Sequence, residues 1–225
     1  MFSQPSIPAD QIRTHYLAPF GLTVLLRQGA PGQAVDSLLI GTPEQFGMIL
    51  FVSSLDAEIY RLHAQTLGEN WIRHPFETIA FQYAVQRLGV ASIYLAFGFF
   101  GNSHRQLILG ASGCLLLPYF AQLFGPLEQP NEPTTFQFST QIFNAIEHEW
   151  ASIGEPYYAQ TVDKLNRMAI TQHGANELRK LAEKALYKAS FSLRTTNEES
   201  PTWALYVPNA DSWQIGSKED PFDLH

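Results

Sequence analysis

The stretch ASIYLAFGFFGNSHRQLILGASGCLLLPYF, residues 91–120, decides the fold of this chain. Two apolar runs in it are separated by the polar residues NSHRQ. Short apolar runs bounded by turn formers are typical of buried strands. We expect residues 90–100 and 105–111 to form a hairpin around GNSH, and residues 114–120 to form a further strand that ends near Pro118.

A membrane segment is the competing interpretation, because residues 107–127 carry no formal charge over a length that could span a bilayer. Two glycines and Pro118 interrupt any helix there. The preceding apolar run, residues 90–100, is too short to cross, and extending it backwards would bury Arg87 in lipid. We therefore expect a sheet covered by helices, and no membrane partner.

The chain before this stretch predicts strands followed by a capped helix. Short apolar runs between turn formers predict strands at residues 21–28, 37–41 and 48–52. Ser53 and Ser54 offer N-caps for a helix whose apolar residues recur at helical spacing until Gly68. A second helix is predicted for residues 76–88.

A proline-rich window, residues 128–134, predicts a linker between an α+β domain, residues 1–127, and a mainly helical segment, residues 135–225. The last predicted helix of that segment extends to Leu193. A C-terminal hairpin should place Tyr206 opposite Trp213, before an acidic tail. The predicted fold class is α+β, with a mixed or antiparallel sheet and covering helices in the N-terminal half, then a mainly helical segment and a C-terminal β-hairpin. Packing of both segments as one domain is the alternative.

The formal charge of −7 comes from 14 Lys and Arg against 21 Asp and Glu. This balance disfavours nucleic acid as a partner, since neutralising phosphates requires a basic face. Cys114 is the single cysteine, so the chain forms no intramolecular disulfide and no zinc site with several cysteines. The first residues, MFSQPSIPADQIR, do not read as a secretory signal, so the cytoplasm is the expected location.

No motif predicts a catalytic residue, a metal site or a cofactor. Residues 110–114 resemble a nucleophile elbow, but Cys114 stands where that motif requires glycine. The seven histidines are isolated rather than spaced as metal ligands, and the residues 147–149 (EHE) would point in different directions from a helix. No glycine-rich segment matches a phosphate-binding loop.

The acidic balance and the aromatic residues indicate a binding protein. We expect a non-enzymatic, cytoplasmic protein-binding module, either a bacterial immunity protein that neutralises a toxin or an adaptor, with a basic protein as its partner. The residues expected to contact the partner are Trp203, Tyr206, Asp211, Trp213, Glu198 and Glu199. The alternative is a hydrolase whose site joins a histidine, such as His104 or His148, to a carboxylate distant in sequence.

Overall fold

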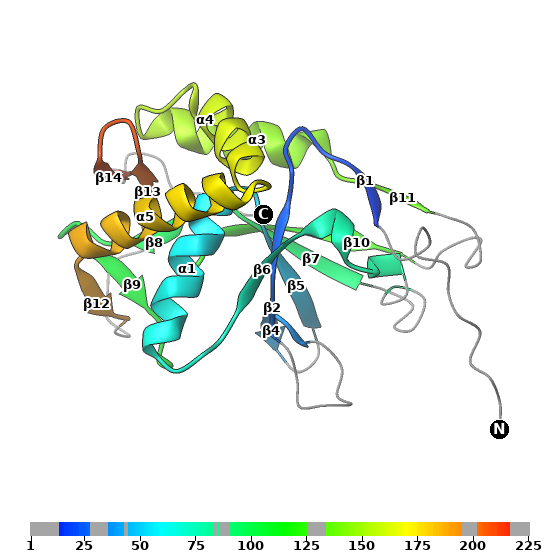
Figure 1. Ribbon diagram of the computed structural model, residues 1–225, viewed down its shortest axis with the longest axis horizontal. Coiled ribbons are helices and arrows are strands. Elements are labelled where there is room, and N and C mark those ends of the chain that lie inside the picture. Colours follow the sequence, from blue (N-terminus) through cyan, green and yellow to red (C-terminus); the bar gives the residue numbers. More distant parts are fainter. Residues whose placement is uncertain are drawn as a thin grey trace.

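The computed structural model describes residues 14–27, 36–42, 45–82, 85, 91–125, 134–194 and 202–216. These residues form an α+β fold with mixed sheets, covering helices and a C-terminal hairpin, which confirms the predicted fold class (Figure 1). The helices are α1 (Ser54–Thr66), α3 (Thr140–Ser152), α4 (Tyr158–Met168), α5 (Gln172–Lys188) and the 3-10 helix η2 (Phe76–Thr78).

The strands form three sheets. The largest runs in the order β10-β7-β5-β2-β3, with β4 paired to β5 and β6 paired to β2. Its members are β2 (Thr23–Arg27), β3 (Asp36–Ser37), β4 (Leu39–Thr42), β5 (Gln45–Phe51), β6 (Ile72–Pro75), β7 (Ala91–Ala96) and β10 (Tyr119–Phe124). A second sheet runs β12-β9-β8-β13-β14 and contains β8 (Phe99–Gly101), β9 (Leu107–Leu109), β12 (Phe191–Leu193), β13 (Thr202–Val207) and β14 (Ser212–Ile215). The third pairs β1 (His15–Leu17) with β11 (Thr135–Gln137).

The stretch 91–120 joins the two larger sheets. Only Phe97 and Gly98 separate β7 from β8, yet these strands belong to different sheets. Gly98 has a φ of 117°, and a Cβ atom there would lie 2.7 Å from the carbonyl oxygen of Ala204. Only glycine combines this backbone conformation with so close an approach. The bend between the sheets is therefore fixed at Gly98.

The predicted hairpin within this stretch is confirmed in part: β8 and β9 pair antiparallel, but the predicted strand at residues 90–100 is broken at Phe97 and Gly98, and β7 pairs in the other sheet. The predicted strand at residues 114–120 is placed differently, because β10 begins after Pro118 instead of ending near it. Of residues 114–118, Leu115 alone makes an isolated bridge, to Leu109. Pro118 has no N–H for a ladder, but its carbonyl accepts a hydrogen bond from the Phe97 N–H at 3.4 Å. The proline thus marks the passage from one sheet to the other.

Helix α1 begins and ends where the sequence predicts. Ser53 is its N-cap, and the Ser53 hydroxyl accepts a hydrogen bond from the Asp56 N–H at 3.4 Å. Gly68 follows the helix with a φ of 85°, the left-handed conformation that commonly ends helices.

Two other helix predictions need correction. Residues 72–78 form β6 and η2, and Phe81, Gln82 and Val85 are helical. Residues 83–84 and 86–88 of the predicted helix lie outside the described residues. Helix α5 ends at Lys188 instead of reaching Leu193, because Ala189 is extended with a ψ of 143°. The Ser190 carbonyl then accepts a hydrogen bond from the Leu107 N–H at 2.8 Å, so pairing with β9 replaces the helix.

Two apolar cores lie on opposite faces of the largest sheet. One joins the sheet to α3, α4 and a group of aromatic side chains, and the other joins it to α1 and α5, which lie side by side in Figure 1. Both cores contain residues from before position 127 and from after position 135. Residues 128–133 of the predicted linker lie outside the described residues.

Candidate functional site

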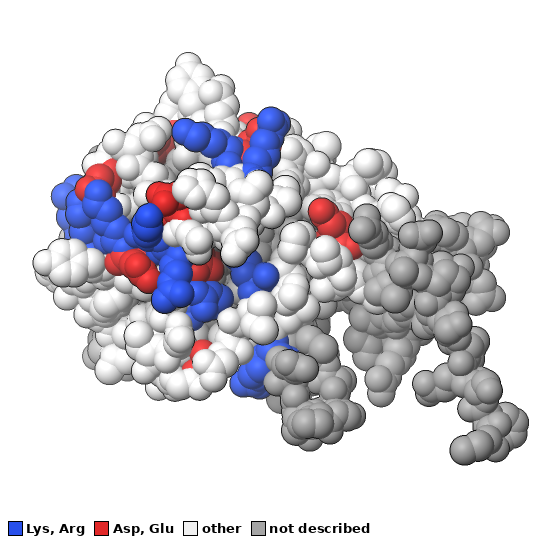
Figure 2. Space-filling model, in the orientation of Figure 1, with Lys and Arg blue, Asp and Glu red and all other residues white. Residues whose placement is uncertain are grey.

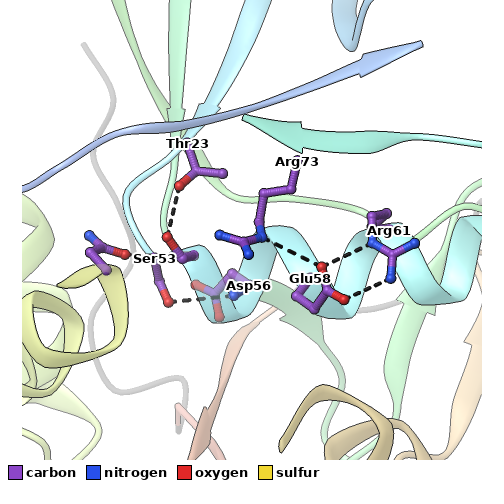
Figure 3. A network of polar contacts seen from close by, with 8 residues as sticks. Thr23, Ser53, Asp56, Glu58, Arg61 and Arg73 are labelled. Carbon is purple, nitrogen blue, oxygen red and sulfur yellow. Dashed lines mark hydrogen bonds and ion pairs between the residues drawn. The ribbon is translucent and has the colours of Figure 1, made fainter. Parts of the chain in front are cut away.

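A buried polar network holds the N-terminal end of α1 (Figure 3). The hydroxyls of Thr23 and Ser54 lie 2.9 Å apart, and the Ser54 N–H donates to Asn166 Oδ1 at 2.7 Å. The Asn166 amide group donates in turn to the carbonyls of Gly21 and Val52 at 2.8 and 2.9 Å. Strand β2, α1 and α4 are therefore tied together. Ser53 and Ser54 serve this structure and do not form an exposed nucleophile.

Glu58 lies at the next turn of α1 and binds two arginines. Arg61 donates to both carboxylate oxygens, at 2.9 and 2.7 Å, and Arg73 approaches from β6 at 3.6 Å (Figure 3). Hydrogen bonding to Glu58 raises the pKa of Arg61, whereas burial lowers the pKa of Arg73. Charged groups this deeply buried are stable only when they are paired. The cluster fixes the distance between α1 and β6.

Asp56 is the least compensated group in this region. Its side chain is fully buried, and neither carboxylate oxygen has a hydrogen-bond partner among the described residues. Burial raises the pKa of Asp56 to about 7, because the charged form loses its hydration. Burial and the Asp56 charge both raise the pKa of Tyr158. With no solvent exposure, Asp56 offers no access to a substrate.

The C-terminal end of α1 positions β12 through His63. The Nε2 atom of His63 lies 2.9 Å from the Gly113 carbonyl oxygen, which accepts the hydrogen bond. The imidazole ring also packs against Phe191, with ring centroids 5.2 Å apart. One turn further along α1, Leu67 lies against Gly113 and is 43% exposed. An apolar surface therefore runs from α1 to β12.

Strand β12 is one of the two edge strands of its sheet, the other being β14, and lies at the left in Figure 1. The Ser190 carbonyl and the Arg194 N–H bond to β9, at 2.8 and 2.9 Å. Because backbone groups alternate in direction along a strand, the N–H and C=O groups of Phe191 and Leu193 point to the outer edge. No described strand pairs there. Phe191 and Leu193 are 37% and 60% exposed, and the Leu193 carbonyl accepts a hydrogen bond from the Ser192 hydroxyl at 3.5 Å. The edge is therefore apolar, and no described strand covers it.

An arginine lies at each end of this edge. Arg105 belongs to the β8–β9 turn, where its φ is 61° and its carbonyl accepts from the Ser190 hydroxyl at 3.4 Å. Arg194 follows β12 directly. Both side chains are exposed, and neither has an acidic partner within the described ranges. We call Leu67, Arg105, Phe191, Leu193 and Arg194 together the β12 edge site.

Two hollows in the surface are weaker candidates. The larger, about 490 Å³, is lined by Arg27, Arg61, Gln65, Gly68, Glu69, Asn70, Trp71 and Ile72. Its charged groups already have partners: Arg27 lies 5.0 Å from the Trp71 ring, Arg61 binds Glu58, and Glu69 accepts from the Trp71 indole N–H at 2.6 Å. The smaller, about 340 Å³, lies beside the start of α3 and includes Glu147. Neither hollow is lined by an arginine or lysine without a partner.

The residues predicted to contact a partner lie at the C-terminal hairpin. Tyr206 and Trp213 are opposite each other as predicted, with ring centroids 5.6 Å apart. Tyr206 is fully buried, Trp203 is 9% exposed, and the Trp213 indole N–H donates to the Ala185 carbonyl at 2.9 Å. These aromatic side chains therefore pack inside the protein. Their contact with a partner stays a prediction.

The acidic residues of that prediction divide into two groups. Asp211 accepts a hydrogen bond from the Tyr206 hydroxyl and pairs with Lys184 and Lys188, each at 2.7 Å. These hydrogen bonds hold the pKa of Asp211 well below its usual range. Glu198 and Glu199 lie outside the described residues.

The two histidines considered for hydrolysis are not brought together with a buried carboxylate. His104 is exposed in the β8–β9 turn, and His148 is exposed on α3. Within the described ranges, no three His, Cys, Asp or Glu side chains are placed to share a metal ion. Among the helices of those same ranges, none has the length and apolar character that a bilayer crossing needs.

The β12 edge site was not predicted from the sequence. Phe191, Ser192 and Leu193 alternate apolar and polar as an edge strand does, but Leu193 also continues the apolar stripe of α5. The alternation of residues 191–193 was the available signal. No protein-family model, curated protein or solved structure matches this chain.

Proposed function

We propose that this protein is a non-enzymatic, cytoplasmic protein-binding module, and that its partner adds an extended strand to the outer edge of β12. No described strand pairs with the outward backbone groups of Phe191 and Leu193, whose side chains are exposed, and this is the observation that supports the proposal. An exposed sheet edge is a template on which another chain can pair. A toxin-neutralising immunity protein and an adaptor are the two roles that fit such a module.

The chemistry of the β12 edge site favours binding over catalysis. The site offers backbone donors and acceptors, apolar side chains and two guanidinium groups, which are groups that hold a ligand. In strand addition, main-chain hydrogen bonds supply affinity and the flanking side chains supply specificity. The support is also rigid, because His63 holds Phe191 against α1 and the Glu58 cluster holds α1 against β6.

The experiment compares Leu193→Pro with Leu193→Ala. Proline removes the outward N–H that would pair with the partner, but it leaves the bonds of Ser190 and Arg194 to β9 in place. Alanine removes the side chain and keeps the N–H. His104→Ala, in the neighbouring turn, serves as the control.

Partners would be captured from the native cell by the wild-type protein, cross-linked, and mapped by mass spectrometry. We expect cross-links at β12 and about fivefold weaker binding of that partner by Leu193→Pro, since one missing hydrogen bond costs roughly 1 kcal/mol. Leu193→Ala should show a smaller loss and His104→Ala none. Unfolding temperatures of all variants would be measured in parallel. Equal binding by wild type and a folded Leu193→Pro variant would refute the proposal.

A further inference from the structure

We infer that the strand received by β12 is an acidic one, with a short apolar core and a carboxylate at each end that Arg105 and Arg194 bind. This inference rests on the proposed function and adds the chemistry of the partner. Arg105 lies beside Ser190, at the start of β12, and Arg194 lies at its end. The two arginines thus lie at opposite ends of β12.

The length of β12 sets the spacing of the ligand. Three residues of a strand span about 10 Å, so a paired segment has an apolar core of about three residues between its acidic positions. The exposed side chains of Phe191 and Leu193 lie on one face, because side chains alternate along a strand. The ligand should therefore be apolar on that face, toward Leu67, and polar on the other.

The local charge at β12 differs from that of the whole chain, on which the expectation of a basic partner depended. The described ranges contain 11 of the 14 Lys and Arg but 12 of the 21 Asp and Glu, so most of the net negative charge belongs to residues outside those ranges. Figure 2 shows Lys and Arg side chains gathered over α1 and α5, with acidic side chains among them. Arg179, Lys180, Lys184 and Lys188 there have acidic partners. Arg105 and Arg194 have none within the described residues and can meet a ligand carboxylate.

A second copy of this chain fits the same edge poorly. If two β12 strands paired antiparallel about a two-fold axis, each Arg194 would approach the start of the other β12, where Arg105 lies. Like charges placed opposite each other across strands are destabilising. An acidic segment of a different protein would place carboxylates opposite Arg105 and Arg194, so that both charge interactions are attractive.

The test uses short capped peptides with a Val-Thr-Val core flanked on both sides by Glu, by Gln or by Lys. Each peptide would be titrated into the full isotope-labelled protein, and the amide shifts of Phe191 and Leu193 would be followed by NMR at low salt. We expect the Glu peptide to bind about three- to tenfold more tightly than the Gln peptide, since each exposed ion pair contributes up to about 1 kcal/mol. The Lys peptide should bind most weakly.

The charge-reversed variant Arg105→Glu/Arg194→Glu should invert this order and prefer the Lys peptide. Arg167→Glu, whose side chain is exposed on α4 and paired with Asp163, is the matched control and should keep the wild-type order. Added salt should reduce the preference for Glu.

The outcomes separate the two proposals. Equal affinity for the Glu and Gln peptides, with shifts centred on β12, would overturn the acidic partner and leave strand addition intact. If no peptide shifts the amide signals of β12, both the acidic partner and strand addition are overturned. A dimer in solution that Leu193→Pro dissociates would replace the acidic partner by a second copy.

Discussion

The rings of His63 and Phe191 lie 5.2 Å apart, and this contact joins the last turn of α1 to the free edge of the second sheet. His63 also bonds the Gly113 carbonyl, so a single buried side chain positions β12 and the loop beside it. The edge that we propose for binding is thus held from the interior of the protein.

Replacing His63 by alanine should loosen this end of the molecule. The change leaves the Gly113 carbonyl without its donor and removes the ring that supports Phe191, so we expect a loss of about 1–3 kcal/mol in the free energy of unfolding. Urea unfolding would measure it. Affinity for the Glu peptide should fall as well. His104→Ala should change neither quantity, and a His63→Ala variant as stable as wild type would contradict this role.

Replacing Asp56 by asparagine should change how stability depends on pH. The pKa of Asp56 is about 7 in the folded protein against an ordinary value of 3.8, so the folded state favours the protonated form. The contribution of Asp56 to the free energy of unfolding is fully present below about pH 3.8 and is lost as the pH rises through about 7. A shift of this size corresponds to something on the order of 4 kcal/mol.

Asp56→Asn should therefore be more stable than wild type at about pH 8, and close to it at about pH 4, when urea unfolding is compared at both values. Asp163→Asn, on the exposed face of α4, serves as the control and should not show this crossover. If Asp56→Asn is less stable than wild type at the higher pH, the carboxylate has a favourable partner.

Gly174 is required by a close approach between α4 and α5. A Cβ atom at this position would lie 2.0 Å from the Met168 carbonyl oxygen, which belongs to the backbone and cannot turn aside. We expect Gly174→Ala to cost about 1–3 kcal/mol through overpacking, and to lower the Tm by calorimetry. Gly125→Ala is the matched control, since no atom of the described residues lies within 4 Å of its added Cβ. Equal Tm values for the two variants would show that the connection between α4 and α5 can move to accept the added Cβ.

Asp211→Asn should weaken the attachment of the C-terminal hairpin to α5. The carboxylate pairs with Lys184 and Lys188 and accepts from Tyr206, so its loss should lower the Tm at low salt. These pairs are partly exposed, so the difference from wild type should shrink at about 1 M salt. A variant that instead keeps the wild-type Tm and loses the captured partner would support a direct role of Asp211 in binding.

Features that local chemistry determines were predicted well from the sequence. The cap at Ser53 and the stop at Gly68 define α1 through hydrogen bonds within a few residues of each end. The register of Tyr206 and Trp213 follows from the length of the turn between them. Strand pairing in hairpins depends on neighbours in the sequence, and so it can be inferred from one chain.

Features that depend on distant residues were not predicted. The chain leaves the helical conformation at Ala189 because β9, far earlier in the sequence, pairs with the following residues. The same pairing brings Arg105 next to Ser190. No spacing pattern in the sequence predicts that contact. The predicted binding residues Trp203 and Tyr206 were judged by type, whereas their burial follows from packing against the other half of the chain.

The pairing of β8 with β13 has a consequence for how the protein is made. Because translation proceeds from the N-terminus, β8 leaves the ribosome long before Thr202–Val207 exist to cover its edge. During that interval the nascent chain exposes apolar strands with no final neighbour. Aggregation should therefore be greatest when synthesis stalls shortly before β13 is made, and a chaperone that shields β8 until β13 emerges should raise the yield.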